Sequence, residues 1–428
     1  MTPSDSSMIS VEEARERILT FFSRLGIERK PLLDALGQVL AEDIVAPFDI
    51  PPLDNTAMDG YAVRATDTTG ASAADWRELR VVADLAAGYI SDTRIGPGET
   101  IRIMTGAPMP PGSDAVVPFE ETDEPLRAVG EAPTKGGTVR IFKAAGTGAN
   151  IRYRAEDVTR GQIIVPSGRV MRPSEVGVLA SIGLIAVPVY RRPVVAILST
   201  GDEITEPGQP LLPGRIYDSN AHGIAAMVQK FGGIPRVLGI ARDTIEDLTR
   251  MIREGFAADM IVTSAGVSRG DFDVVKDVLA REGAIDFWTV RMKPGKPLAF
   301  GAFRGPDGRS VPHLGLPGNP VSSMVSFELF GRPAIFKMLG RNDWERPVLR
   351  AITRDAVVNT DARRFYARCI VSKGEDGRYY ADLTGPQGSG ILTSMSAANA
   401  LTIIPEDVPL ANPGDEIDVM MLDWEQAP

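Results

Sequence analysis

The sequence of 428 residues contains one cysteine, Cys369, and two histidines, His222 and His313. A single cysteine excludes an intramolecular disulfide framework and a cysteine-rich zinc site. Two histidines exclude a histidine-based metal cluster and disfavour a Ser-His-Asp triad. We expect structural roles for both, because His222 lies near the start of a predicted helix and His313 lies inside a predicted strand. The chemistry of this chain must therefore use carboxylates, lysines, hydroxyls and backbone amides.

The chain also lacks long apolar segments and a net positive charge. No apolar run approaches the roughly 18 to 20 residues of a membrane-spanning helix. Residues 1–6 lack the basic and apolar parts of a signal peptide, so we expect a cytoplasmic protein without a membrane partner. The formal net charge of −10 argues against nucleic acid as a partner. It does not exclude a small anion, because the local field inside a cleft outweighs the net charge.

The composition is that of a globular enzyme, with 43% hydrophobic and 24% charged residues. The length exceeds that of one ordinary hydrophobic core and predicts three or four domains. The 43 glycines and 33 prolines are consistent with many tight turns and short strands.

The N-terminal part is predicted to be a composite of helices and strands. Ser10-Val-Glu-Glu13 is a capping box that opens an amphipathic helix over residues 10–25, with Gly26 as its stop. A second helix is predicted over about residues 31–42, and another over residues 172–180. We expect the first helix to pack on the α/β domain described next.

The remaining domains follow from alternation of apolar runs and turns. We predict a composite N-terminal domain of residues 1–46 and 146–190, interrupted by a β-rich insert of residues 47–145. Residues 191–340 alternate strands with helices and predict a parallel, doubly wound α/β domain. Its helices are expected at about residues 220–231, 244–256, 271–282 and 320–339. Residues 341–428 return to strands and turns and predict a small C-terminal β domain. The fold class is therefore a multidomain α/β protein.

Polar clusters follow several strands of the predicted α/β domain. The segment Ser199-Thr200-Gly201-Asp202-Glu203 follows the apolar run 194–198, and Asp243 follows the run 236–241. A third cluster follows the run 259–262 and contains Ser264, Gly266, Ser268 and, at the next helix start, Asp273. Because the carboxyl ends of parallel strands line one crevice, we expect these clusters to converge on one ligand site.

The most informative motif is Pro317-Gly318-Asn319-Pro320, between a predicted strand and a predicted helix that includes Ser322. Backbone N–H groups of such a loop and a helix N-terminus form an anion site. An ordinary β–α turn is the alternative for this stretch alone. Upstream, Lys293 and Lys296 lie on a proline-flanked turn and supply positive charge.

Together these motifs resemble those of the molybdenum insertases, the bacterial MoeA type and the C-terminal domain of gephyrin. The matching segments are 52–62, 102–110, 199–203 and 293–320, in the same order as in the family. The first two segments lie outside the α/β domain, so other proteins built on that domain do not need them. The resemblance implies four domains, with the β-rich insert folded out from the composite N-terminal part.

The resemblance also implies the reaction and the assembly. The reaction would be insertion of molybdate into adenylylated molybdopterin with release of AMP, dependent on Mg²⁺. The partner would be a second copy of the chain, in a homodimer whose active cleft lies between the α/β domain of one subunit and the insert of the other. Asp59 and Thr105 would reach that cleft from the insert. A molybdopterin adenylyltransferase would act upstream.

The residue types suit this chemistry on their own. Molybdate and a pyrophosphate link are oxyanions, so lysines and N–H donors are appropriate partners. A hard divalent cation needs oxygen ligands, which Glu203, Asp243 and Asp273 offer. With Asp59 these are the predicted catalytic carboxylates, and the first three are the predicted metal ligands. Helix capping is the alternative role for Asp243 and Asp273.

Two positions depart from the family pattern. Thr289 stands where many relatives have a basic residue four positions before Lys293, although Arg291 is nearby. Ala265 stands where relatives often have a second glycine, which limits that turn to conformations that alanine tolerates. Neither change removes a carboxylate.

Two other functions compete with this interpretation. One is a molybdopterin adenylyltransferase-like enzyme, which shares the α/β domain but lacks the flanking domains. The other is a catalytically silent scaffold of the same fold, which retention of the carboxylates and both lysines disfavours. A nicotinamide dehydrogenase is excluded, because residues 146–151 lack the third glycine of a dinucleotide fingerprint.

Overall fold

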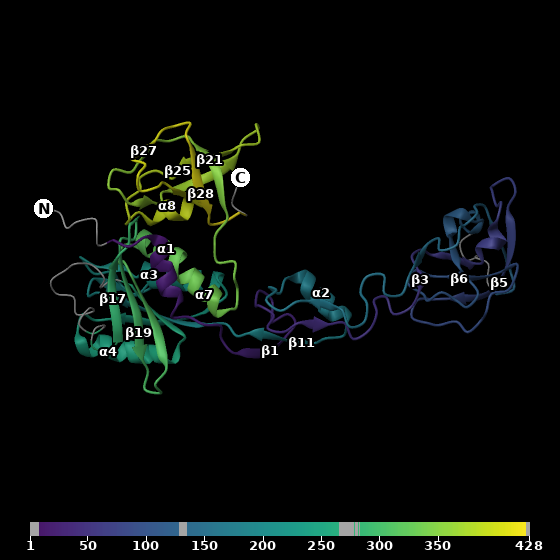
Figure 1. Ribbon diagram of the computed structural model, residues 1–428, viewed down its shortest axis with the longest axis horizontal. Helices are drawn as coiled ribbons and strands as arrows, with labels where there is room; N and C mark the ends of the chain where they lie inside the picture. Colours follow the sequence, from purple (N-terminus) through teal and green to yellow (C-terminus); the bar gives the residue numbers. More distant parts are fainter. Residues whose placement is uncertain (1–7, 128–134, 265–277, 279–280, 282, 425–428) are drawn as a thin grey trace. The chain divides into compact units, whose positions relative to one another are not determined.

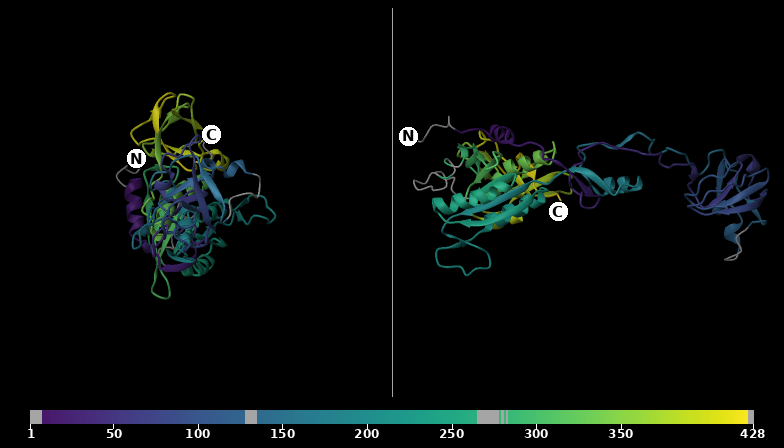
Figure 2. Two further views of the ribbon diagram at one scale, coloured as in Figure 1. Left: turned by 90° about the vertical axis from the view of Figure 1, so that its right-hand side faces the viewer. Right: turned by 90° about the horizontal axis from the view of Figure 1, so that it is seen from below.

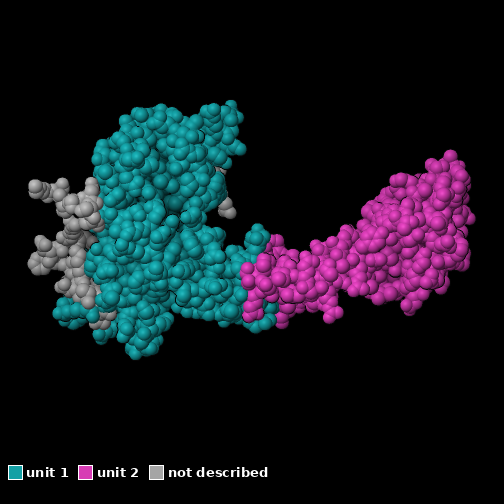
Figure 3. All heavy atoms as spheres, viewed as in Figure 1, with its two compact units in different colours: residues 1–41, 168–173, 186–428 teal, residues 42–167, 174–185 magenta. Residues whose placement is uncertain are grey.

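The computed structural model describes residues 8–127, 135–264, 278, 281 and 283–424. The chain forms two compact units (Figure 3). Unit 1 comprises residues 1–41, 168–173 and 186–428, and unit 2 comprises residues 42–167 and 174–185. Figures 1 and 2 trace the chain from the purple N-terminal segment to the yellow C-terminal strands.

Unit 1 begins with helix α1 (Val11–Leu19), which packs on the α/β domain. The Ser10 hydroxyl accepts a hydrogen bond from the Glu13 N–H at 3.0 Å, as the capping-box motif predicts. The helix ends at Leu19 and not near residue 25. Val11 and Ile18 are buried in the same core as the central sheet, so hydrophobic burial of one face fixes the helix on that domain.

The predicted helix over residues 31–42 is wrong. Strand β1 (Ile27–Pro31) pairs antiparallel with β11 (Ala186–Tyr190), and turns follow at residues 32–37. Leu40, fully buried, forms a bridge to Val189. The apolar residues are thus buried by pairing with a segment about 150 positions away in the chain, and such distant partners override local helical spacing.

The centre of unit 1 is a six-stranded sheet with the order β15-β12-β16-β20-β19-β17. The strands are β12 (Val194–Thr200), β15 (Ile234–Ala241), β16 (Met260–Ser264), β17 (Gly283–Thr289), β19 (Pro297–Arg304) and β20 (Ser310–Leu316). The first four in this order are parallel, whereas β19 and β17 are antiparallel to their neighbours. The prediction of a wholly parallel sheet therefore needs correction. Only residues 305–309 join β19 to β20, which is too short for a parallel crossover.

Helices cover both faces of this sheet (Figure 1). On one face lie α1, α3 (Ser219–Lys230), α6 (Pro320–Ser326) and α7 (Arg332–Met338), with a π-helical turn (Phe327–Gly331) between the last two. On the other lies α4 (Ile245–Glu254), followed by the short helix η5 (Gly255–Ala257). Alternate residues of β12 enter the two cores, Val195 the first and Ala196 the second. This confirms a doubly wound α/β domain. The predicted helix 271–282 lies almost entirely outside the described residues.

The C-terminal part of unit 1 is a closed five-stranded barrel. Its strands are β21 (Val348–Thr353), β24 (Arg368–Lys373), β25 (Tyr379–Leu383), β26 (Ala400–Ile403) and β28 (Glu416–Met421), and helix α8 (Leu392–Ala397) precedes β26. A small sheet pairs β22 (Val357–Val358) with β27 (Leu410–Ala411). Strand β18 (Met292–Lys293) pairs with β23 (Arg364–Phe365) and ties this part to the α/β domain. Cys369 is buried in the barrel core, and burial raises the pKa of its thiol to about 12.

Unit 2 is built on a five-stranded sheet with the order β7-β4-β6-β5-β8. These strands are β4 (Gly60–Val63), β5 (Arg77–Leu85), β6 (Glu99–Ile103), β7 (Ala115–Pro118) and β8 (Thr138–Ile141). Two further pairs join β3 (Asn55–Thr56) to β9 (Ile151–Arg152) and β2 (Ile44–Val45) to β10 (Ile163–Val165). Its helices are α2 (Pro173–Ser181), η2 (Ala65–Thr68), η3 (Phe119–Glu121) and η4 (Glu124–Leu126). In the part of the chain that the structure describes, no helix has the length and apolar character needed to cross a membrane.

The two histidines differ in burial. His313 in β20 is fully buried, with its Nε2 atom 2.9 Å from the Thr263 hydroxyl and its ring against Phe303. Burial lowers the pKa of His313 to about 3. His222 is exposed, and its Nδ1 atom lies 3.0 Å from the Asp218 carbonyl oxygen. Both contacts are structural in character, as expected.

Acid should destabilise unit 1 through His313. Between its ordinary pKa of 6.5 and the folded value of about 3, the unfolded chain binds a proton that the folded chain does not. The free energy of unfolding should therefore decrease by at most about 1.4 kcal/mol for each unit by which the pH is lowered in this window. His313→Leu removes the ionisable group. As the pH is lowered, the free energy of unfolding of wild type should therefore decrease more steeply than that of the variant. Urea unfolding at several pH values measures it. His222→Gln is the matched control, and parallel pH profiles for wild type and His313→Leu would contradict the assignment.

Candidate active site

The carboxyl ends of four parallel strands lie along one edge of the sheet. The strand register pairs Thr200 with Ala241, Ser199 with Ser264, and Ser264 with Leu316. From β12 the chain moves to β15 on one side and then to β16 on the other side. The ends of β12 and β16 therefore flank a topological switch point, where open α/β sheets bind ligands. The strand ends thus lie along one edge, as expected.

A cavity of about 630 Å³ lies at this edge. Seven of the predicted site residues line it: Ser199, Thr200, Glu203, Ser264, Gly318, Asn319 and Pro320. The other lining residues are Ile204, Ile216, Tyr217, Asp218, Ser219, Asn220, Gly390 and Leu392. The last two come from the C-terminal part, so both parts of unit 1 contribute to the wall.

Gly201 allows Glu203 to fold back beside the end of β12. Its φ of +135° is a conformation that side chains disfavour. A Cβ atom there would lie 2.5 Å from a carboxylate oxygen of Glu203. Beyond this turn, β13 (Ile204–Thr205) pairs with β14 (Ile216–Tyr217). Glycine is therefore required next to the acidic residue.

The Pro317-to-Pro320 loop leads from β20 into α6, as the motif predicts. Asn319 is the N-cap with extended backbone, and Pro320 occupies the first turn. One N–H group of that turn is already used, because the Val321 N–H donates to the Ser389 carbonyl at 3.1 Å. Pro317 and Ser322 are buried and do not line the cavity.

Sequence reasoning missed Asp218 and Asn220, which precede and open α3. Oδ1 of Asp218 accepts from the Ala221 N–H at 3.0 Å and caps the helix. Among the described residues, Oδ2 of Asp218 is buried without a hydrogen-bond partner, as is the Ser199 hydroxyl. The available signal was weak: this polar pair follows β14, which is only two residues long.

The lysine turn lies beside α6 but does not line the cavity. Nζ of Lys293 is 3.6 Å from a carboxylate oxygen of Asp361 and 4.7 Å from the centre of the Phe365 ring. Lys296 is exposed. Gly295 has a φ of +101°, and a Cβ atom there would lie 2.5 Å from the Ser326 hydroxyl. The turn is therefore packed against the helix that starts at the cavity.

The remaining predicted residues of the α/β domain divide into two groups. Asp243 follows β15 and is exposed, outside the cavity lining. It does not cap α4, because Thr244 is the N-cap and accepts from the Asp247 N–H at 3.3 Å. The predictions for Gly266, Ser268 and Asp273, and the departure at Ala265, fall outside the described residues. The other departure, Thr289, lies in β17 opposite Pro297.

In unit 2, Asp59 and Thr105 contact each other directly. The Thr105 N–H and hydroxyl donate to Oδ1 of Asp59 at 2.7 and 2.8 Å. Both bonds lower the pKa of Asp59, and the bond from the Thr105 backbone N–H has the larger effect. The carboxylate is exposed and ionised, and two donors from one residue fix its orientation.

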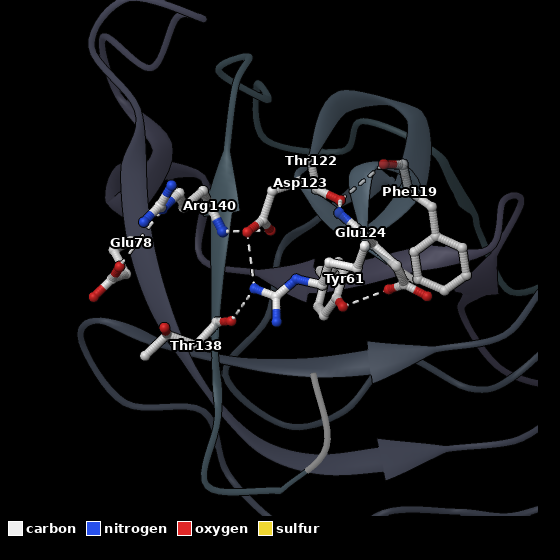
Figure 4. Close-up of polar contacts among 9 residues, drawn as sticks. Tyr61, Glu78, Phe119, Thr122, Asp123, Glu124, Thr138 and Arg140 are labelled. Atoms are coloured by element: carbon white, nitrogen blue, oxygen red, sulfur yellow. Dashed lines mark hydrogen bonds and ion pairs between the residues drawn. The ribbon is translucent and has the colours of Figure 1, made fainter. Parts of the chain in front are cut away.

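A half-buried ionic cluster around the buried Tyr61 supports this pair. The Tyr61 hydroxyl donates to Glu124 at 2.5 Å (Figure 4). Arg102 forms a bidentate pair with the same carboxylate and lies 4.5 Å from the centre of the Phe119 ring. Tyr61 of β4 is directly paired with Arg102 of β6, and only Gly60 separates Tyr61 from Asp59. Burial raises the pKa of the Tyr61 hydroxyl. The cluster holds the strands that carry Asp59 and Thr105.

Comparison with known proteins agrees with this architecture. The chain matches the MoeA N-terminal region (domain I and II) at residues 9–183, a probable molybdopterin binding domain at residues 196–337, and the MoeA C-terminal region (domain IV) at residues 350–422. A Mycobacterium tuberculosis protein named molybdopterin molybdenumtransferase 2 is 37% identical over 91% of this chain and 93% of its own length. The chain belongs to the MoeA family.

Other MoeA-family proteins extend the match. A molybdopterin molybdenumtransferase of Nostoc is 36% identical over 91% of this chain and 87% of its own length. A solved structure of the MoeA protein of Pyrococcus horikoshii, 29% identical, has a TM-score of 0.78 and covers 97% of this chain and 100% of that one. The resemblance inferred from four short sequence segments is confirmed over nearly the full chain.

Thr105→Val should raise the pKa of Asp59 toward its ordinary value. The substitution removes the hydroxyl donor but keeps the backbone N–H, so the pKa should rise without reaching that of a free aspartate. Carbon-13 NMR of aspartate-labelled protein, titrated with acid, measures the change. Thr93→Val, at an exposed threonine of the same unit, should leave the pKa unchanged. An identical Asp59 titration in wild type and Thr105→Val would contradict the hydrogen-bond pattern.

Proposed function

We propose that this chain is a molybdopterin molybdenumtransferase, which inserts molybdenum into molybdopterin during molybdenum cofactor biosynthesis. The carrying observation is the cavity at the switch point, where seven site residues predicted from the sequence meet. MoeA-family proteins of this name match more than 90% of the chain. The volume of about 630 Å³ lies within the range typical of small-molecule sites.

The proposed co-substrates are molybdate and adenylylated molybdopterin, with AMP as the product. Both substrates present oxyanions. The hydroxyls of Ser199 and Ser264 offer neutral donors at the cavity, whereas the Thr200 hydroxyl donates to the Ser264 carbonyl at 3.4 Å. Lys293 and Lys296 offer positive charge from the turn packed on α6. The side chains would place one oxyanion against the other, which favours reaction by proximity.

Magnesium is the proposed cation, and the cavity has oxygen donors for it. Glu203 and Asp218 are the carboxylates of the lining, and one oxygen of Asp218 has no protein partner among the described residues. Within the described ranges no three metal-binding side chains cluster. Mg²⁺ usually takes one or two carboxylates with substrate phosphates and water, so Glu203 and Asp218 would suffice. When bound, it would offset negative charge on the departing phosphate. Asp273 remains a proposed ligand, whereas exposed Asp243 lies outside the lining.

The rival functions are less well supported. A molybdopterin adenylyltransferase-like enzyme would need only the α/β domain, yet the chain also matches the MoeA N-terminal and C-terminal regions. A silent scaffold would have no need for Glu203, whose position depends on the unusual conformation of Gly201.

AMP release from adenylylated molybdopterin in the presence of Mg²⁺ should depend on molybdate. Glu203→Gln removes a charge without changing shape and should slow this release by roughly tenfold or more. Asp202→Asn, at an exposed neighbour outside the cavity lining, is the matched control and should behave as wild type. Chromatographic quantification of AMP measures the rate. Equal release with and without molybdate would replace the proposal by simple nucleotide hydrolysis.

We also propose that the chain acts as a homodimer in which Asp59 of one copy completes the cleft of the other. Asp59→Ala and Glu203→Ala homodimers should then both be nearly inactive, because each cleft holds one damaged residue. In a mixed dimer, one cleft carries both changes and the other carries none. Mixing and re-annealing the two variants should therefore restore about one intact site per heterodimer. Each variant re-annealed alone is the control, and verified heterodimers as inactive as their parents would refute the shared cleft.

A further inference from the structure

The side chain of Asn220 joins two separate segments at the cavity. Its Nδ2 atom donates to the Ser264 hydroxyl at 2.7 Å and to the Gly318 carbonyl at 2.7 Å. A backbone carbonyl only accepts hydrogen bonds, so the atom that faces Gly318 must be the amide nitrogen. Both N–H donors of the amide are thereby used.

The two segments are distant in sequence and are both predicted to hold the substrate. Ser264 is the last residue of β16, and Gly318 lies in the loop that leads into α6. They lie 44 and 98 positions from Asn220 in the chain. One amide therefore sets the separation between the end of β16 and the Pro317-to-Pro320 loop.

Asn220 is not needed to build α3. Asp218 is the N-cap of that helix and already satisfies the Ala221 N–H. Within the described chain, Oδ1 of Asn220 is buried without a hydrogen-bond partner, like Oδ2 of Asp218 and the hydroxyl of Ser199 in the same lining. Native structures rarely leave buried polar atoms unpaired, so three in one cavity indicate a place where a polar ligand binds.

We infer that Asn220 is a positioning residue for the proposed reaction: it holds the end of β16 and the Gly318 loop at one fixed separation, so that both act on the same oxyanion. The inference rests on the proposed function. Preorganised donors add to catalysis only if their supporting contacts are rigid. The two 2.7 Å contacts made by a single side chain provide such support.

Asn220→Asp tests the role with almost no change in shape. An ionised carboxylate cannot donate to the Gly318 carbonyl, so kcat should fall by roughly 100-fold.

Two further variants separate positioning from stability. Asn220→Ala lacks both amide donors and should also lose kcat. Gln229→Glu places the same amide-to-carboxylate change on the exposed last turn of α3 and should retain wild-type kcat and nearly the wild-type melting temperature. A loss of kcat in Asn220→Asp that a lower melting temperature fully explains would overturn the inference, as would wild-type kcat in both Asn220 variants.

Hydrogen exchange provides a readout that does not depend on activity. In Asn220→Asp, peptides that contain Ser264 or Gly318 should exchange faster than in wild type, while peptides from β19 should not change. Unchanged exchange in both peptides would overturn the inference even if the proposed reaction is absent. Failure of wild type to release AMP in response to molybdate would instead refute the proposed function.

Discussion

The structure depends on one constraint: the strands of the central sheet that follow β12 in the chain are added first on one side of it and then on the other. Because β15 pairs with one side of β12 and β16 with the other, the helices that follow β12 and β15 pack on opposite faces. The ends of β12 and β16 therefore flank a topological switch point, where open α/β sheets bind ligands. The antiparallel strands β19 and β17 extend the sheet on the side away from β15 and leave this edge intact.

Electrostatics explain why this edge cannot act alone on oxyanions. The charged residues of the cavity lining are Glu203 and Asp218, both acidic, and the described lining contains no lysine or arginine. Two carboxylates repel a phosphate or a molybdate ion unless a cation offsets them. The proposed magnesium ion and the nearby lysine turn would supply positive charge. In the structure, Nζ of Lys293 contacts Asp361 and the Phe365 ring and does not reach the cavity lining.

Sequence patterns predicted those features that depend on neighbouring residues. The Ser10 capping box, the polar ends of β12 and β16, and the Asn319-Pro320 helix start were correct because each depends on residues a few positions apart. The helix predicted at residues 31–42 failed because Leu40 is buried through pairing with a strand about 150 positions away. Asp218 and Asn220 were missed for a related reason. Strand β14 is only two residues long, so no apolar run drew attention to its end.

The state of Asp59 limits what its carboxylate can do. Two donors from Thr105 stabilise the ionised form and lower its pKa. A carboxyl group whose pKa is lowered further from neutral pH is a poor proton donor or acceptor, because general acid–base catalysis works best when the pKa lies near the operating pH. Asp59 is therefore better suited to act as a fixed negative oxygen that orients a substrate donor or a bound cation. The cluster of Tyr61, Arg102 and Glu124 has the corresponding structural role, because it fixes the two strands whose turns bring Asp59 and Thr105 together.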